Sequence, residues 1–287
     1  LKLHPTDTEW YRPGQMLAFY QVRNLRLEDV TLANTTAWTC HVRCSDGFVA
    51  RRVKILADVH FPNNDGIHIN CSRNVTVSNC DITCGDDCII VRANNVSLPT
   101  GENKVCEKVA VTNCNLTSYA SGIRVGWIND GVIRDCTFSS LVMTDTLVGI
   151  ALVFPYLSAS SSSDIGREAS LVESLSFSDI IMDGSVYPIK VRIDDHPDVH
   201  INKVRRLYFR GIRANGIEFP FLSGTRDHII EDVRFSDCSF RIYEPADCPH
   251  FDIRGSEGNY HYDGKQHTML CNHTRGIMLD SVSFDVY

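Results

Sequence analysis

The chain has 287 residues, of which 43% are hydrophobic and 22% charged, and its formal net charge is −7. This balance is typical of a globular protein and allows one large domain or two small ones. No basic stripe and no apolar run of membrane-spanning length occurs, so we expect neither a nucleic-acid nor a membrane partner. No signal peptide is recognisable, and Leu1 looks like the first residue of a mature or trimmed chain.

One eight-residue pattern recurs along the chain. It reads apolar, any residue, apolar, two polar or small residues, apolar or Cys, any residue, apolar, which is the alternation of a β-strand. Copies lie at residues 25–32, 48–55, 75–82, 109–116, 131–138, 175–182, 207–214, 233–240 and 277–284. A strand that returns at this interval, with further strands between, predicts an all-β parallel β-helix whose stacked turns, or rungs, share one core.

A second set of strands alternates with the first, at residues 66–69, 88–91, 122–125, 149–152, 188–191 and 220–223. The second and fourth residues of each segment are nearly always apolar, so we expect them to point inward. The third residues are then expected to point outward: His68, Ile90, Arg124, Ala151, Lys190 and Leu222. Because His68, Arg124 and Lys190 share this face, with Arg192 two residues further on, the sequence predicts a cleft.

Three carboxylates fall at the start of these strands. Asp65 and Asp87 are 22 residues apart, which places them on neighbouring rungs, with Asp86 beside Asp87. Like charges held this close raise at least one pKa, as a general acid beside a general base requires. The structural alternative is that these aspartates occupy turns, which Asp and Asn favour. Other Asn and Asp residues of the repeat are expected to form a ladder on a turn: Asn79, Asn113, Asp135, Asp179 and Asp237.

Segments at residues 94–107, 154–168 and 243–275 interrupt the rungs, and such excursions usually form the walls of a binding groove. The first repeat begins soon after the N-terminus, although the end of a β-helix needs a cap. We therefore predict a single β-helix domain over residues 1–287 that lacks N-terminal rungs or is capped by its first residues.

The 12 cysteines match neither a disulfide scaffold nor a zinc site. Four of them recur at one position of the repeat, where other copies carry Val or Ile, so we expect buried thiols there: Cys80, Cys114, Cys136 and Cys238. Cys248 and Cys271 flank a polar insert and are candidates for a disulfide.

With these features in place, the sequence resembles glycoside hydrolase family 28, the polygalacturonases and rhamnogalacturonan hydrolases. The similarity runs from about Arg12 to the C-terminus. It is carried by Thr36-Ala37-Trp38-Thr39, Asn63-Asn64-Asp65-Gly66 and Gly85-Asp86-Asp87-Cys88. The resemblance implies a right-handed, single-stranded parallel β-helix, and it implies that the family's N-terminal rungs are missing here.

The resemblance also implies inverting hydrolysis. By resemblance, Asp86 is the general acid, Asp65 and Asp87 hold and deprotonate the attacking water, and Asn63 is a hydrogen-bonding neighbour. Inversion needs carboxyl groups roughly 6.5–9.5 Å apart. Side chains that diverge from rungs about 4.8 Å apart can reach that separation.

Two positions depart from the family pattern. Ser121 stands where the family usually has His, and Pro188-Ile189-Lys190 stands where it has Arg-Ile-Lys. Arg124 and Lys190 remain candidates for binding a uronate, His68 is a candidate replacement for the lost imidazole, and Arg192 and Ser121 complete the expected substrate-binding set. We therefore expect a divergent member that acts on a branched or mixed pectic glycan.

Three functions remain open from the sequence. The first is a metal-free and cofactor-free glycoside hydrolase that cleaves a uronate-containing poly- or oligosaccharide. The second is a pectate-lyase-like polysaccharide lyase, which would use calcium on its carboxylates and an Arg as base. The third is a carbohydrate-binding β-helix without catalysis. We expect a monomer that is secreted or periplasmic, and sequons favour secretion at Asn34, Asn70, Asn74, Asn95, Asn115 and Asn272.

Overall fold

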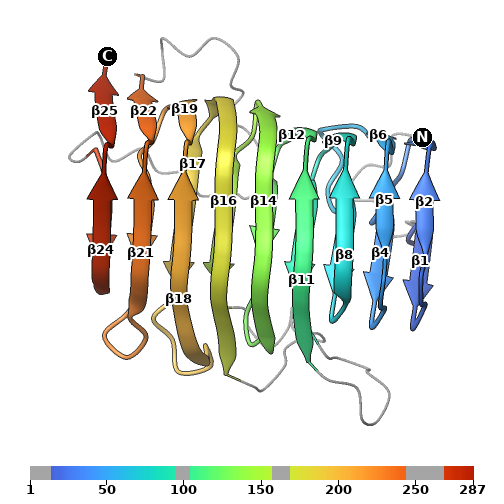
Figure 1. Ribbon diagram of the computed structural model, residues 1–287, viewed down its shortest axis with the longest axis horizontal. Helices are drawn as coiled ribbons and strands as arrows, with labels where there is room; N and C mark the ends of the chain where they lie inside the picture. Colours follow the sequence, from blue (N-terminus) through green and yellow to red (C-terminus); the bar gives the residue numbers. More distant parts are fainter. Residues whose placement is uncertain (1–13, 95–103, 157–168, 244–267) are drawn as a thin grey trace, which may run out of the picture.

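The computed structural model describes residues 14–94, 104–156, 169–243 and 268–287. In these ranges the chain forms β-strands and no helix, and the strands pair in parallel. Figure 1 shows the rungs stacked along the long axis, from the N-terminal rung in blue to the C-terminal rung in red. The predicted parallel β-helix is therefore confirmed. No helix among the described residues is long and apolar enough to span a membrane.

The strands form two sheets. The first, with nine strands, will be called the site sheet; it contains, in spatial order, β1 (Leu17–Tyr20), β4 (Cys40–Arg43), β7 (Ile67–Asn70), β10 (Ile89–Arg92), β13 (Ser121–Val125), β15 (Val148–Phe154), β17 (Tyr187–Ile193), β20 (Phe221–Ser223) and β23 (Leu270–Asn272). The sixteen-stranded sheet will be called the repeat sheet because it carries the eight-residue pattern.

The repeat sheet is built from two shorter strands per rung or from one long, bent strand. Its members are β2 (Arg26–Glu28), β3 (Thr31–Ala33), β5 (Val49–Arg51), β6 (Lys54–Leu56), β8 (Arg73–Ser78), β9 (Asp81–Cys84), β11 (Val105–Thr112), β12 (Asn115–Ser118), β14 (Val132–Thr144), β16 (Ser170–Ser185), β18 (Ile201–Arg210), β19 (Arg213–Gly216), β21 (Ile230–Ser236), β22 (Ser239–Ile242), β24 (Thr274–Asp280) and β25 (Ser283–Val286).

Identical positions of successive rungs stack inside the coil. Phe138, Phe177, Phe209 and Phe235 are fully buried, and their ring centroids lie 4.9, 5.1 and 4.8 Å apart along the stack. Offset aromatic stacking of this kind adds to the area that each ring buries. No single rung can enclose such a core, so the repeats stabilise one another only when stacked.

The frame of the fifth repeat was predicted incorrectly. Cys136 pairs with Leu175 and Met143 with Met182, so this copy spans residues 136–143 and not 131–138. Both frames show the same apolar spacing, and sequence alone did not separate them. Consequently Cys136 does not share the position of Cys80 in the repeat, although both thiols are buried as expected.

The outward row of the site sheet also needs one correction. Lys190 pairs with Phe221, so Phe221 occupies the outward position expected for Leu222. Leu222 is fully buried in the core. The error arose because Pro220 was aligned with Pro188, whereas the strand register is shifted by one residue between these rungs.

The expected polar ladder on a turn exists. Asn79, Asn113, Asp179 and Asp237 all have φ between 54° and 59°, a left-handed backbone conformation that Asn and Asp tolerate better than most residues. Asp135 also has a positive φ but lies at an earlier turn, because of the frame error at the fifth repeat. These residues have a structural role, as predicted.

Charged residues alternate in sign along one edge of the repeat sheet. In strand register the row reads Arg23, Asp46, Arg73, Glu107, Arg134, Glu173, Arg205, Glu231 and Arg275. We call this row the ion-pair ladder. Its contacts include Arg73 Nε to Asp46 Oδ2 at 2.9 Å and Arg205 Nε to Glu173 Oε2 at 2.9 Å. Alternation places opposite charges on neighbouring rungs, whereas identical stacked charges would repel.

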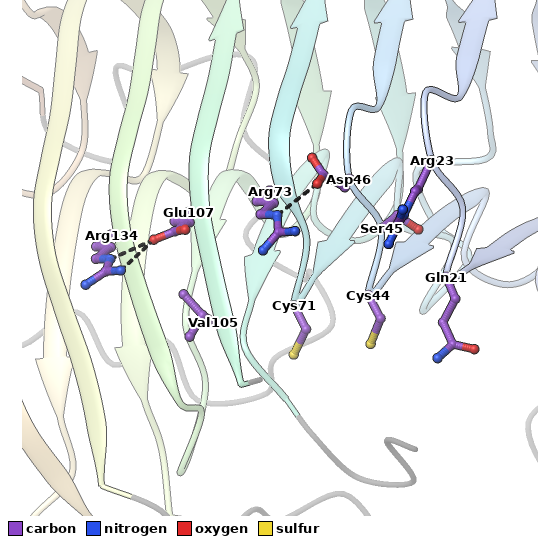
Figure 2. A pocket seen from close by; sticks show the side chains of 10 residues that line it. All are labelled: Gln21, Arg23, Cys44, Ser45, Asp46, Cys71, Arg73, Val105, Glu107 and Arg134. Atoms are coloured by element: carbon purple, nitrogen blue, oxygen red, sulfur yellow. Dashed lines mark hydrogen bonds and ion pairs between the residues drawn. The ribbon is translucent and has the colours of Figure 1, made fainter. Parts of the chain in front are cut away.

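The N-terminal part of the ladder borders a cavity of about 450 Å³ (Figure 2). The Arg73–Asp46 and Arg134–Glu107 pairs line it, together with Cys44 and Cys71 from neighbouring rungs. The cavity lies away from the three aspartates, and its charges already pair with one another. We therefore do not place the functional site here.

Several expectations fall outside the described residues. Cys248 lies there, so its pairing with Cys271 stays a prediction, as does capping by residues 1–13. Most of the three excursions from the rungs also lies outside the described ranges.

Candidate active site

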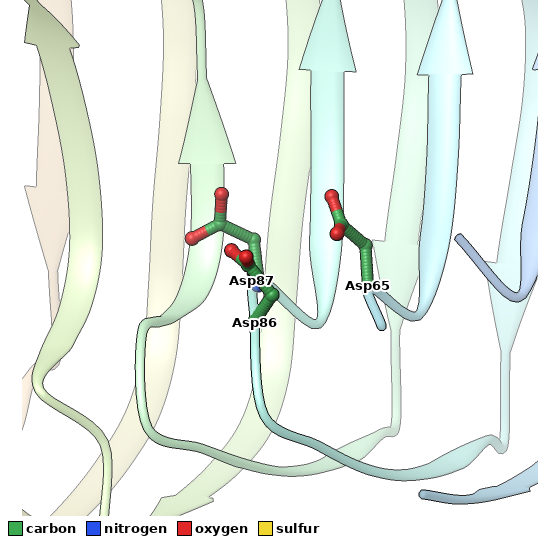
Figure 3. Close-up of side chains that lie close together, drawn as sticks. All are labelled: Asp65, Asp86 and Asp87. Carbon is green, nitrogen blue, oxygen red and sulfur yellow. Dashed lines mark hydrogen bonds between the residues drawn. The ribbon is translucent and has the colours of Figure 1, made fainter. Parts of the chain in front are cut away.

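The three aspartates lie where two neighbouring strands of the site sheet begin. Ile67 of β7 pairs with Ile89 of β10, so Asp65 and Asp87, each two residues upstream, stack on adjacent rungs. Asp86 precedes Asp87 in the same turn. The predicted convergence of these carboxylates is confirmed, and Figure 3 shows their side chains on the same side of the chain.

Close backbone contacts fix this arrangement. A Cβ atom at Gly66 would lie 2.3 Å from the Cys88 carbonyl oxygen, and one at Gly85 would lie 2.4 Å from the Phe61 carbonyl oxygen. The buried Asn64 side chain ties the two turns together, because it accepts a hydrogen bond from the Gly85 N–H at 2.6 Å. The glycines and Asn64 therefore hold the two carboxylate-bearing turns in contact.

The three carboxylates converge. One oxygen of each lies within 4.8 Å of the others, whereas the sequence prediction assumed that the side chains diverge. Asp65 and Asp87 are buried and Asp86 is half-buried.

Each aspartate has its own hydrogen-bonding environment. Asp86 Oδ2 accepts the backbone N–H of Asn63 at 2.9 Å, and the Asn63 side-chain amide lies 3.3 Å from the same oxygen. Asp86 Oδ1 accepts the Asp87 N–H at 2.9 Å. Asp87 Oδ1 accepts the backbone N–H of Ser121 at 3.0 Å. Asn63 is thus a hydrogen-bonding neighbour of the carboxylates, as expected, and Ser121 reaches Asp87 through its backbone N–H.

Burial and like charge act together on Asp65. Loss of water raises the pKa of this carboxyl well above its usual value, and the nearby Asp86 and Asp87 raise it further. Arg124 acts in the opposite direction with a smaller effect. The cluster therefore retains a proton at pH values where isolated aspartates are ionised, which is the property required of a site that donates one.

A cavity of about 270 Å³ adjoins the carboxylates on their C-terminal side. Arg124, Lys190 and Arg192 line it, together with Trp127 and Tyr187. The Arg124 guanidinium lies 4.0 Å from the Trp127 ring centroid, and Lys190 Nζ lies 4.2 Å from that of Tyr187. Arg192 Nε is 2.8 Å from Asp194 Oδ1. Cations and rings side by side suit an acidic sugar.

His68 lies on the other side of Asp65. Its ring is only 3% exposed, packs 4.2 Å from the Trp38 ring and 5.0 Å from the His41 ring, and does not line the cavity. His68 Nδ1 is 3.8 Å from Asp65 Oδ2. Burial lowers the pKa of His68 well below its usual value and that of His41 to about 4. Both imidazoles are therefore neutral at pH 7.

Three residues near the site were not predicted. Cys40 pairs with Ile67, so Trp38, two residues before Cys40, occupies the position of Asp65 on the preceding rung. His41 pairs with His68 on the same two rungs. Trp127 follows β13 and lies beside Arg124. Trp38 belongs to the Thr36–Thr39 segment that resembles the family. Its position two residues before a strand, like that of Asp65, could have predicted that it lies near the site. Nothing in the sequence marked Trp127.

Several buried polar atoms of the site have no hydrogen-bond partner in the protein. Among the described residues these include Asp65 Oδ1, His68 Nδ1 and Arg124 Nε. Buried polar groups normally find a partner, and exceptions cluster where a ligand or water binds. The three aspartates are also the one cluster of acidic, His or Cys side chains, among the residues described, with the spacing of metal ligands.

Three converging carboxylates beside a cationic and aromatic cavity are an arrangement typical of carbohydrate-processing sites. Sequence comparison identifies the family: the model of glycosyl hydrolases family 28 matches residues 7–239. The chain belongs to this family, as the motifs around Asp65 and Asp87 predicted.

Individual relatives are distant. A probable polygalacturonase of Arabidopsis thaliana is 27% identical over 178 residues, which cover 55% of this chain and 39% of that protein. A polygalacturonase of Brassica napus is 25% identical over 240 residues, covering 80% of this chain and 56% of its own length. This chain thus spans about half the length of the curated relatives it matches.

Solved structures share the fold. An exopolygalacturonase from Thermotoga maritima superposes with a TM-score of 0.73 at 19% identity, over 96% of this chain and 55% of its own. A family 28 exopolygalacturonase from Yersinia enterocolitica gives 0.59 at 16% identity, over 92% and 45%. The chain is a right-handed parallel β-helix, as predicted.

Proposed function

We propose that this protein is a glycoside hydrolase that cleaves a pectic polysaccharide by inversion. The observation that carries the proposal is the convergence of Asp65, Asp86 and Asp87 beside a cationic cavity, in a chain of family 28. Family membership does not favour a lyase, and the Arg124 guanidinium lies 3.8 Å from Asp87, a charge neighbour that disfavours its use as a base.

Asp86 is the proposed general acid. It is the most exposed of the three aspartates, and the Asn63 N–H fixes its Oδ2. Asp86 gives its proton to the glycosidic oxygen, which leaves with its sugar. Proton transfer from a positioned side chain contributes about 10²–10⁴-fold to the rate.

Asp65 and Asp87 are the proposed ligands of the attacking water. They stack on adjacent rungs, and Asp65 Oδ1 has no partner in the protein. Two acceptors can hold one water with both its hydrogens directed at carboxylate oxygens, which leaves a lone pair free to attack the anomeric carbon. As the new C–O bond forms, one of the two carboxylates takes a proton from the water. Inversion follows if that water and Asp86 act on opposite faces of the sugar.

The proposed substrate carries a uronate, whose carboxylate would lie in the cavity lined by Arg124, Lys190 and Arg192. Ser121 in place of His, and Pro188 in place of Arg, distinguish this cavity from the usual family pattern and favour a branched or mixed pectic glycan. The full proposed substrate-binding set is Asn63, His68, Ser121, Arg124, Lys190 and Arg192. Within this set, His68 packs against the Trp38 ring and lies beside Asp65, outside the cavity.

We also propose that the protein acts as one β-helix domain, as a monomer, without a metal or other cofactor, and outside the cytoplasm. Substrates of this size do not enter cells intact. Asn70 is buried and cannot be glycosylated in this fold, but the exposed sequons at Asn34, Asn74, Asn115 and Asn272 support secretion. Mass determination of the protein from its native source tests this directly.

The test is product analysis on pectic oligosaccharides, including rhamnogalacturonan fragments, with and without chelator. We expect saturated products that persist with chelator, whose initial anomer is inverted by NMR, and whose release is lost in Asp86→Asn. Asp81→Asn, an exposed aspartate of β9 on the repeat sheet, is the matched control and retains activity. Unsaturated products that require calcium would identify a lyase. Binding without release, equal in Asp86→Asn, would identify a binding module.

A further inference from the structure

Arg124 is a buried cation for which the fold gives no reason. It is 6% exposed, and its register neighbours on adjacent rungs are Ile90 and Ala151. Burying a charge is costly unless it is paired. The ion-pair ladder shows how this chain pairs charges that serve the fold, and Arg124 is not part of it.

The contacts of Arg124 direct it toward Asp87. Arg124 Nη1 lies 3.8 Å from Asp87 Oδ2, while the Trp127 ring, 4.0 Å from the guanidinium carbon, supports the other side of the group. Nε is buried without a protein acceptor. The spacing to Asp87 exceeds a direct hydrogen bond. Arg124 thus acts on Asp87 chiefly as a charge.

The three aspartates differ in what faces them. Asp87 has the Ser121 N–H on one oxygen and Arg124 near the other, both of which favour the ionised form. Asp86 accepts hydrogen bonds from N–H donors, and no arginine or lysine of the described part of the chain forms an ion pair with it. Asp65 faces its two acidic neighbours, with His68 as its nearest basic side chain. The three carboxyl groups therefore lie close together but in different electrostatic environments.

We propose that Arg124 is a positioning residue that keeps Asp87 ionised and oriented toward the attacking water. In this chain the task is divided: Ser121 supplies a backbone N–H where an imidazole was expected, and Arg124, on the same strand, supplies the charge. The inference rests on the proposed function for its catalytic meaning. The coupling between Arg124 and Asp87 is a property of the protein that can be measured without a substrate.

The kinetic test compares Arg124→Gln and Arg124→Lys with the wild type across pH. An opposite charge at this distance lowers a carboxyl pKa by about one to three units. Loss of that charge in Arg124→Gln is therefore expected to move the acidic limb of the kcat/KM profile upward by about one unit or more. Arg124→Lys keeps a charge and is expected to restore most of the shift. Lys190→Gln, in the same cavity, is the comparison and should raise KM without moving the limb.

The second readout is NMR titration of ¹³C-labelled aspartate carboxyls, with Asp87→Asn used to assign the signal. Arg124→Gln is expected to raise the titration midpoint of Asp87, and thermal unfolding verifies that each variant is folded. An unmoved midpoint would overturn the proposal, as would a variant that raises KM alone.

If the wild type hydrolyses nothing, the proposed function fails, but the titration still decides whether Arg124 and Asp87 are coupled. If Arg124→Gln does not fold, Arg124→Lys and Trp127→Phe carry the titration, with smaller expected shifts in the same direction.

Discussion

Two rows of outward-facing residues run along this β-helix, and they differ in which residues lie next to each charged side chain. In the ion-pair ladder every acidic residue lies between arginines on the neighbouring rungs. The row of the site sheet, which we call the cavity row, reads Ala18, His41, His68, Ile90, Arg124, Ala151, Lys190 and Phe221. There the cations alternate with apolar residues.

The difference separates charges that serve the fold from charges that serve a ligand. Ladder residues compensate one another, so the folded state needs nothing further from them. Arg124 and Lys190 lie between apolar residues at the same register position on the neighbouring rungs, so they do not belong to a row of alternating charges. Substitutions of Arg124 and Lys190 should therefore alter activity, whereas substitutions in the ladder should alter stability.

Asp65→Asn should give the largest effect. We expect kcat/KM to fall about 10²–10⁴-fold, because the attacking water loses a carboxylate ligand. Stability should move the other way at neutral pH. Since the pKa of Asp65 is raised on folding, its contribution to stability is present below about pH 4 and is lost as pH rises through the folded-state value.

Denaturant unfolding at pH 4 and pH 7.5, together with initial rates, measures both effects. The stability difference between Asp65→Asn and the wild type should favour the variant increasingly as pH rises. A variant that is both inactive and less stable at pH 7.5 would indicate that Asp65 is a structural turn residue.

His41 should give the next largest effect, on pH-dependent stability. Burial, with Arg43 and Arg92 nearby, lowers its pKa from 6.5 to about 4. Its contribution is therefore fully present above pH 6.5 and lost as pH falls through 4, about 3 kcal/mol in total at 1.36 kcal/mol per unit. His41→Gln should remove this loss. The comparison is unfolding free energy between pH 7.5 and pH 4, with the neutral-pH values of both proteins as the reference. Parallel curves would contradict the expectation.

Glu173→Gln tests the ladder at a buried position. Glu173 is 8% exposed and its Oε2 lies 2.9 Å from Arg205 Nε and 2.7 Å from Arg206 Nη2. Because hydrogen bonds to charged groups contribute about 1.5–3 kcal/mol, we expect a loss of that size in unfolding free energy. Activity should be unchanged, since Glu173 belongs to the repeat sheet. If Glu173→Gln lowered kcat without lowering the unfolding free energy, the ion-pair ladder could not be assigned to stability alone.

The sequence correctly predicted the features that depend on the repeat interval, but not those that depend on the register between neighbouring strands. Repeating strands predicted the β-helix, and the 22-residue interval correctly stacked Asp65 on Asp87. Where two frames had the same apolar spacing, as at residues 131–143, pattern alone chose the wrong one. A shift of one residue at Phe221 reversed which side chain faces outward, because strand side chains alternate between faces.

The same limit explains the unexpected neighbours of the site. Trp38 and His41 reach Asp65 and His68 only because the preceding rung is in exact register with β7. Arg124 was expected as a substrate ligand from its outward position, yet its approach to Asp87 depends on support from Trp127. Contacts between side chains of different rungs depend on rotamers that no repeat pattern specifies.

Asp46→Asn should give the smallest effect and sharpens the comparison within the ladder itself. Asp46 accepts hydrogen bonds from Arg73 Nε at 2.9 Å and from Asn74 Nδ2 at 2.7 Å, and these bonds lower its pKa. The Arg73 side chain is 56% exposed, so water and salt screen the pair. We expect a fall in melting temperature that is measurable at low ionic strength and disappears in 1 M salt. Because the folded-state pKa of Asp46 is lowered, the effect should begin to fade at about pH 4 and be lost as pH falls through that lowered value. Glu173→Gln should keep most of its effect in salt. Equal, salt-insensitive losses in both variants would mean that pairing, and not burial, sets the contribution of each ladder position.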